Sequence, residues 1–238
     1  MHILQFNNGL LQRRKRGIRL LYRVHSLVFL LLMGLGSSVA LAAGQVTPLQ
    51  TVLVHGDSLS AAYGMEEEAG WVALLQQQQP GLKVVNTSLS GETTSGGKQR
   101  LPALMQQFRP QLLVLELGAN DALRGQNLQA TEANLQAMID LCENAAWSCR
   151  TVLLGVRLPT NYGPAYDQLF QRMYARLAER NQLVFEPFFI EDAALDPDLM
   201  QWDGLHPAAQ AQPLILKRVW RLLEPLLSKE PLIKSEVP

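Results

Sequence analysis

The chain has 238 residues, with 21 basic and 21 acidic side chains and no formal net charge at pH 7. The first 42 residues hold six of the basic residues and no acidic one. The remaining 196 residues therefore carry 15 basic against 21 acidic side chains, a formal charge of −6. That balance argues against nucleic acid as a partner, and the length suits one domain with a sizeable core.

The amino-terminal segment has the pattern of a signal peptide. Basic residues between Arg13 and Arg23 precede an uncharged stretch from Leu27 to Ala42. Its 16 residues fall short of the roughly 20 that span a bilayer. We expect cleavage after Ala42 and export to the periplasm, or secretion, with no stable membrane anchor. An uncleaved amphipathic anchor is the alternative.

Residues 43–227 are expected to form one domain, followed by a disordered tail at 228–238. Strands are predicted at 51–55, around 84–85, at 112–117, at 151–156 and near 183–185. Helices are predicted at 71–79, 101–108, 128–146, 166–180 and 208–227, with a Gly/Ser/Thr-rich loop at 88–97. Alternation of strands and helices predicts a three-layer α/β/α sandwich with a mainly parallel sheet.

Function in such sheets collects in the crevice outside the carboxyl ends of the strands. Four segments rich in polar residues and glycine follow predicted strands, at 56–60, 88–91, 118–121 and 203–207. We therefore expect the groups that act together in function to lie in these segments.

A catalytic base is most often a histidine, and the chain has few histidines that could serve. Of four histidines, only His55 and His206 lie beyond the first 42 residues. His55 falls within an apolar strand, which favours a satisfied, half-buried structural residue. His206 lies on a loop, and Pro207 suits the first position of the following helix. His206 is therefore the candidate base.

Two further residues complete a candidate triad. Asp203 precedes His206 by three residues, a spacing that allows its carboxylate to orient the imidazole. Ser58 follows a strand, and Gly56 permits a sharp bend that exposes the hydroxyl. Taken alone, Asp203 reads as a turn residue and Ser58 as part of a helix cap. They indicate a catalytic triad only because they occur together with His206.

An acyl-transfer enzyme also needs donors for the oxyanion of the tetrahedral intermediate. Gly91 can bring its backbone N–H close because it has no side chain, and Asn120 offers a neutral carboxamide. The structural alternatives are a turn glycine and a helix cap. All four features occur in order after successive strands, which favours function.

These blocks resemble those of the GDSL, or SGNH, hydrolases, named for Ser, Gly, Asn and His in separate segments. The matching blocks are Gly56-Asp57-Ser58-Leu59-Ser60, Gly91, Gly118-Ala119-Asn120-Asp121 and Asp203-Gly204-Leu205-His206-Pro207. Residues 117–125 and 157–163 are similar, more narrowly, to the bacterial periplasmic thioesterase, lysophospholipase and arylesterase branch. Ala119 stands where glycine is frequent in that branch.

The resemblance implies a flavodoxin-like sandwich and a serine esterase that needs no cofactor or metal. Ser58 would be the nucleophile, His206 the base and Asp203 its orienter. The N–H groups of Ser58 and Gly91 and the amide of Asn120 would form the oxyanion hole. Substrates would be small acyl esters, thioesters or lysophospholipids, in a groove bordered by residues 122–125 and 158–162. Its substrate-binding residues would be Leu158, Pro159 and Tyr162.

Two other classes of function stay open at this point. A metallohydrolase could gather Asp57, Asp121, Asp203 and His206, although two histidines offer little for a metal. A non-catalytic binding module could use the same fold.

The two cysteines, Cys142 and Cys149, suit either a local disulfide in an exported protein or two buried thiols. The cysteine pair is not a hallmark of the family that the chain resembles.

Overall fold

The structure is a computed structural model that describes residues 50–227. The expected signal peptide and tail lie outside these residues. Five strands form the sheet, and they are β1 (Gln50–Gly56), β2 (Leu82–Asn86), β3 (Leu112–Glu116), β4 (Arg150–Leu154) and β5 (Val184–Glu186). All are parallel, in the order β2-β1-β3-β4-β5.

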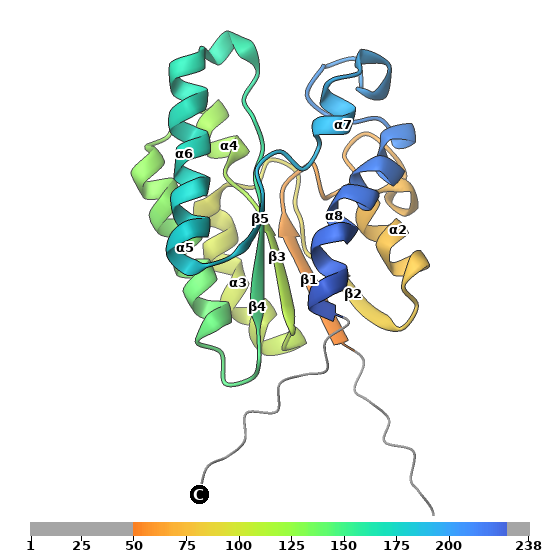
Figure 1. Cartoon of the computed structure of the whole chain (residues 1–238), viewed down its shortest axis with the longest axis vertical. Coiled ribbons are helices and arrows are strands. Elements are labelled where there is room, and N and C mark those ends of the chain that lie inside the picture. Colours follow the sequence, from red (N-terminus) through yellow and green to blue (C-terminus); the bar gives the residue numbers. More distant parts are fainter. Residues whose placement is uncertain (1–49, 228–238) are drawn as a thin grey trace, which may run out of the picture. The chain divides into compact units, whose positions relative to one another are not determined.

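Helices cover both faces of the sheet. The α-helices are α2 (Trp71–Gln78), α3 (Thr94–Phe108), α4 (Ala119–Leu123), α5 (Leu128–Glu143), α6 (Pro164–Asn181), α7 (Glu191–Ala194) and α8 (Gln212–Leu227). Short 3-10 turns are η1 (Glu67–Ala69), η2 (Thr160–Tyr162), η3 (Pro197–Leu199) and η4 (Ala209–Ala211). Helices α3, α5 and α6 lie on one side and α2 and α8 on the other, which confirms the three-layer sandwich (Figure 1).

The core explains why the strands read as apolar. Every residue of β3 is buried, as is β1 from Thr51 to Gly56. A central parallel strand packs helices on both faces, so neither face can be polar without a partner. Among residues 50–227 no helix is long and apolar enough to cross a membrane.

Several predicted helix bounds are wrong, and one helix forms where a loop is expected. Helix α3 begins at Thr94, not near residue 101, because the Thr93 side chain caps it by accepting the Gly96 N–H at 3.3 Å. Residues 119–123 form the short helix α4 instead of an open loop.

The predicted start of the last helix is also wrong. Pro207 does not open it but pairs with Met200 in an isolated antiparallel bridge. The Ala208 N–H donates to the Leu199 carbonyl at 2.8 Å, which keeps this segment extended. Only η4 and then α8 follow.

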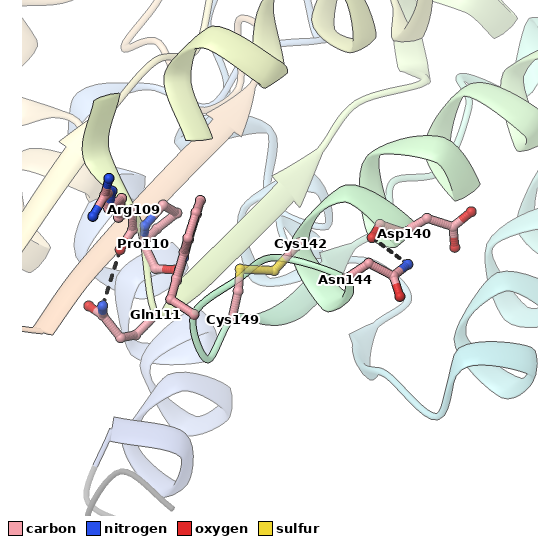
Figure 2. The surroundings of a disulfide bond; sticks show 8 residues. Arg109, Pro110, Gln111, Asp140, Cys142, Asn144 and Cys149 are labelled. Carbon is pink, nitrogen blue, oxygen red and sulfur yellow. Dashed lines mark hydrogen bonds between the residues drawn. A yellow bond between two sulfur atoms is a disulfide. The ribbon is translucent and has the colours of Figure 1, made fainter. Parts of the chain in front are cut away.

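The two cysteines form a disulfide at the end of α5. Cys142 and Cys149 are joined, with their Cα atoms 5.3 Å apart, and the bond closes the loop before β4 (Figure 2). The Trp147 indole in this loop donates to the Pro110 carbonyl at 2.9 Å. The loop therefore lies at the amino ends of the strands, opposite the edge where Ser58 follows β1.

Strand order creates a crevice between the loops after β1 and β3. From β1 the chain moves outward to β2, then returns past β1 to β3. The helices that follow β1 and β3 therefore lie on opposite faces, and the loops leading to them diverge. Ser58 lies on the first of these loops, and Asn120 lies at the start of α4, directly after the second.

Candidate active site

Three of the predicted residues form a continuous hydrogen-bonded row. His206 Nε2 lies 2.9 Å from the Ser58 hydroxyl oxygen. On the other side of the ring, His206 Nδ1 lies 2.7 Å from Asp203 Oδ2. The side chains of His206 and Asp203 are 19% and 17% exposed, so both are partly accessible to solvent. This geometry matches nucleophile, base and orienter.

The segment bearing His206 is held by its own turn. Asp203 Oδ1 accepts the backbone N–H groups of Leu205 and His206, at 2.9 and 3.0 Å. Burial raises the pKa of Asp203, but hydrogen bonds from His206 and these N–H groups outweigh it and hold the pKa below its usual value. The carboxylate thus stays ionised beside the imidazole.

Tyr63 is a neighbour of the base that sequence reasoning missed. Its ring centroid lies 4.4 Å from that of His206, at an interplanar angle of 38°. The Gln201 amide donates to the Tyr63 carbonyl at 2.7 Å, which ties this loop to the loop of His206. A lone tyrosine in a turn gives no sequence signal of such a contact.

The candidate oxyanion donors come from three segments, which follow β1, β2 and β3. Asn120 lies in the first turn of α4, and its Nδ2 donates to Asp57 Oδ2 at 3.1 Å. Gly91 has a φ of +78°, a backbone conformation that favours glycine. Within residues 50–227 neither the Gly91 N–H nor the Ser58 N–H has a hydrogen-bond acceptor.

A cavity of about 640 Å³ opens beside these groups. Ser58, Asn120 and His206 line it, whereas Gly91 does not. Gly91 lies on the loop after β2. This loop begins beside the end of β1, where the Leu89 N–H donates to the Gly56 carbonyl at 3.1 Å. The site therefore combines one polar wall with a larger space for substrate.

The remaining cavity wall is mostly apolar. Among its residues are Leu123, Val156, Leu158, Pro159, Ile190 and Leu205. Tyr162, named with Leu158 and Pro159 as substrate-binding, is not among the lining residues. Its hydroxyl donates to the Leu123 carbonyl at 3.0 Å and so supports the opposite border of the cavity. Tyr162 shapes the cavity indirectly.

Two buried acids lie directly behind the nucleophile. Asp57 and Glu116 are each 1% exposed. Burial is the main cause that raises the pKa of Asp57 to about 6. Burial, and then the neighbouring charge of Asp57, raise the pKa of Glu116 well above its usual value. The available signal was Glu116, the one charged residue in an otherwise apolar strand.

The other histidine has a structural environment. His55 is fully buried, not half-buried, with Nε2 3.0 Å from the Gly97 carbonyl and Nδ1 3.0 Å from the Thr87 hydroxyl. Desolvation is the main cause that lowers its pKa to about 4. The Nε2–H of neutral His55 donates to the Gly97 carbonyl, and Nδ1 faces the Thr87 hydroxyl.

The acids named for a metal site are used otherwise. Asp121 accepts the backbone N–H and the hydroxyl of Thr94, at 2.8 and 2.5 Å. In the part of the chain that the structure describes, no group of three or more His, Cys, Asp or Glu side chains is placed to hold a metal ion.

Residues 54–212 match the model of the GDSL-like lipase/acylhydrolase family. The chain belongs to this family. Esterase TesA of Pseudomonas aeruginosa is 44% identical over 77% of the chain and 92% of its own length. Thioesterase 1/protease 1/lysophospholipase L1 of Escherichia coli K12 is 41% identical over 76% of the chain and 86% of its length.

A solved structure of another relative agrees with the fold of this GDSL hydrolase. The psychrotrophic esterase EstA from Pseudoalteromonas sp., inhibited by monoethylphosphonate, superposes with a TM-score of 0.71. It is 38% identical, with 76% of this chain and all of that chain covered. The GDSL hydrolase is thus an enzyme that cleaves ester or thioester bonds.

Proposed function

We propose that this GDSL hydrolase acts through a covalent acyl-enzyme on Ser58. The observation that carries the proposal is the row of contacts from Ser58 through His206 to Asp203, at 2.9 and 2.7 Å. A serine hydroxyl is a weak nucleophile, and a base in hydrogen-bond contact is what activates it. Asp203 holds the proton on His206 Nδ1, leaving Nε2 free to act as the base.

The reaction proceeds in two similar halves. Ser58 Oγ attacks the substrate carbonyl while His206 Nε2 takes its proton. The tetrahedral intermediate collapses, and His206 returns the proton to the leaving alcohol or thiol. Water then attacks the acyl-serine with His206 again as base, which releases the acid and restores Ser58.

The oxyanion is stabilised by the N–H groups of Ser58 and Gly91 and by the Asn120 carboxamide. Support comes from the two backbone N–H groups, which have no acceptor within residues 50–227, and from Asn120 at the cavity wall. One such donor contributes about 2.7–4 kcal/mol of transition-state stabilisation.

The substrates are small acyl esters and thioesters, including lysophospholipids. A cavity of about 640 Å³ is within the usual range for small-molecule sites, and its apolar wall suits an acyl chain. Leu158 and Pro159 are part of that wall. The two relatives described above are an esterase and a thioesterase/protease/lysophospholipase.

The enzyme works after export, as a domain at 43–227 between a signal peptide at 1–42 and a tail at 228–238. The Cys142–Cys149 disulfide supports an oxidising compartment such as the periplasm. Sequencing the amino terminus of protein recovered from a periplasmic extract tests this. A start at Ala43 is expected, and a start at Met1 would contradict it.

Hydrolysis of p-nitrophenyl acetate tests the assignment of the nucleophile. Ser58→Ala should fold normally and lose essentially all activity, whereas treatment of the wild type with a chelator should change nothing. A folded Ser58→Ala variant with wild-type turnover would refute the triad. Activity lost to the chelator and restored by a metal ion would favour a metallohydrolase instead.

A further inference from the structure

A buried carboxylate holds the Asn120 carboxamide. Asp57 Oδ2 accepts an N–H of Asn120 at 3.1 Å, while its Oδ1 accepts the Leu59 N–H at 3.0 Å. A primary amide carries two N–H groups on its nitrogen. With one bonded to Asp57, the other is available to a substrate oxygen.

A second buried acid fixes the backbone of Asp57. Glu116 Oε2 accepts the Asp57 N–H at 3.2 Å and the Ser60 hydroxyl at 2.8 Å. Glu116 reaches this position because residue 56 is glycine. A Cβ there would lie 2.6 Å from Glu116 Oε2. The segment that bears Ser58 is thereby attached to β3, the strand that leads to Asn120.

The pair carries one negative charge near neutral pH. Two buried carboxylates in contact cannot both ionise cheaply, and the pKa of Glu116 is the more strongly raised. The charge therefore resides on Asp57. An ionised carboxylate has acceptors only, so the group that faces it must be a donor.

We propose that Asp57 is a positioning residue that fixes the orientation of the Asn120 carboxamide and so directs its second N–H to the oxyanion. The flipped amide would place its carbonyl oxygen against Asp57, where two acceptors repel. It would also remove the N–H from the oxyanion. The inference rests on the proposed role of Asn120 and deepens it.

A purely structural role for Asp57 makes a different prediction. As a cap of the turn after β1, Asp57 would contribute to stability, and its loss would affect turnover independently of Asn120. Coupling between Asp57 and Asn120 separates the two roles, because residues that act as a unit give non-additive losses.

The test is a double-mutant cycle on hydrolysis of p-nitrophenyl acetate. Asp57→Asn replaces an obligate acceptor with a group that can also donate, and so permits the flipped amide. We expect kcat to fall about tenfold or more, with KM within about threefold, because the lost interaction is made mainly in the transition state. In the Asn120→Ala background, Asp57→Asn should cause no further loss.

Asp121→Asn is the matched control. It is the same substitution at a carboxylate that is also 1% exposed and adjacent to Asn120, but its partners are Thr94 and Thr131. We expect stability to fall while kcat stays within about twofold. Circular dichroism and urea unfolding establish that each variant folds, and Asp57→Ser replaces Asp57→Asn in the cycle if the latter does not.

The outcomes separate this proposal from the one it rests on. If the losses from Asp57→Asn and Asn120→Ala multiply, Asp57 does not act through Asn120 and the proposal alone is overturned. If Asn120→Ala keeps wild-type kcat, Asn120 is not an oxyanion donor and both fail. An equal fall in kcat for Asp121→Asn would also overturn it, because the effect would then follow from any buried charge lost nearby.

Discussion

The hydrogen-bonding roles of the residues around Ser58 are fixed by their neighbours. The Ser58 hydroxyl contacts an imidazole whose far nitrogen is occupied by Asp203, so only one ring nitrogen can take its proton. Asn120 faces an acid that accepts but does not donate. Each polar group therefore has a single productive orientation, as preorganised electrostatic catalysis requires.

His55 should make stability depend on pH in an unusual way. Its pKa is about 4 in the fold against 6.5 in the unfolded chain, so the unfolded state binds more protons between these values. Stability is therefore lost as the pH falls from 6.5 towards 4. Asp57, with a raised pKa of about 6, acts in the opposite direction, since the folded state then binds the extra proton.

Replacing His55 isolates its contribution. His55→Gln keeps a side chain that can donate and accept but does not titrate. The wild type should lose about 3 kcal/mol more unfolding free energy than the variant between pH 7 and pH 4. Urea unfolding at the two pH values measures this. If the unfolding free energies of the two proteins differ by the same amount at pH 7 and at pH 4, His55 does not titrate as described.

Among individual residues, the sequence predicts the polar groups of the site but not the buried residues that hold them in place. Ser58 and Asn120 could be named because each follows a buried strand. His206 could be named because few histidines lie beyond residue 42, and Asp203 because it precedes His206 by three residues. The contact of Glu116 with residue 57 depends on β3 lying beside β1, a pairing that local sequence does not encode. Tyr162 was named for the cavity, but its hydroxyl turns towards Leu123.

Among the elements, strands were easier to predict than the starts of helices. The strand at 112–117 could be recognised because all its residues except Glu116 are apolar, as burial on both faces favours. Helix α3 starts within a stretch rich in glycine and serine, where the Thr93 cap outweighs poor helix propensity. The bridge of Pro207 with Met200 likewise overrides a residue that suits a helix start.

The disulfide should stabilise the junction between α5 and β4 without affecting catalysis. Cys142 and Cys149 are seven residues apart, and closing so short a loop is worth about 2.5 kcal/mol in the chain-entropy model. The double variant Cys142→Ser/Cys149→Ser should lose about this much unfolding free energy. Its kcat should equal that of the wild type, because the loop is at the opposite ends of the strands from Ser58.

Chemical denaturation and ester hydrolysis on the same preparations provide both values. A dithiothreitol-treated wild type is the matched control and should resemble the double variant. Unchanged stability in both samples would show that the bond does not constrain the chain. A large fall in kcat would show that the two ends of the sheet are coupled.

For the whole molecule, the parallel sheet is what assembles the site. Ser58 and His206 are 148 residues apart in sequence but lie in hydrogen-bond contact. The order β2-β1-β3-β4-β5 makes the loops after β1 and β3 diverge and leaves a crevice between them. The fold class followed from the alternation of strands and helices, whereas the size of the cavity depends on side-chain packing that alternation does not determine.

Trapping the acyl-enzyme tests the central claim most directly. Wild-type protein mixed with p-nitrophenyl acetate, quenched in acid during turnover and digested, should yield one acetylated peptide with the modification on Ser58. Ser58→Ala should yield none, and His206→Ala should acetylate far more slowly. Steady turnover with no adduct, or an adduct on another residue that forms and decays at the rate of turnover, would contradict the account.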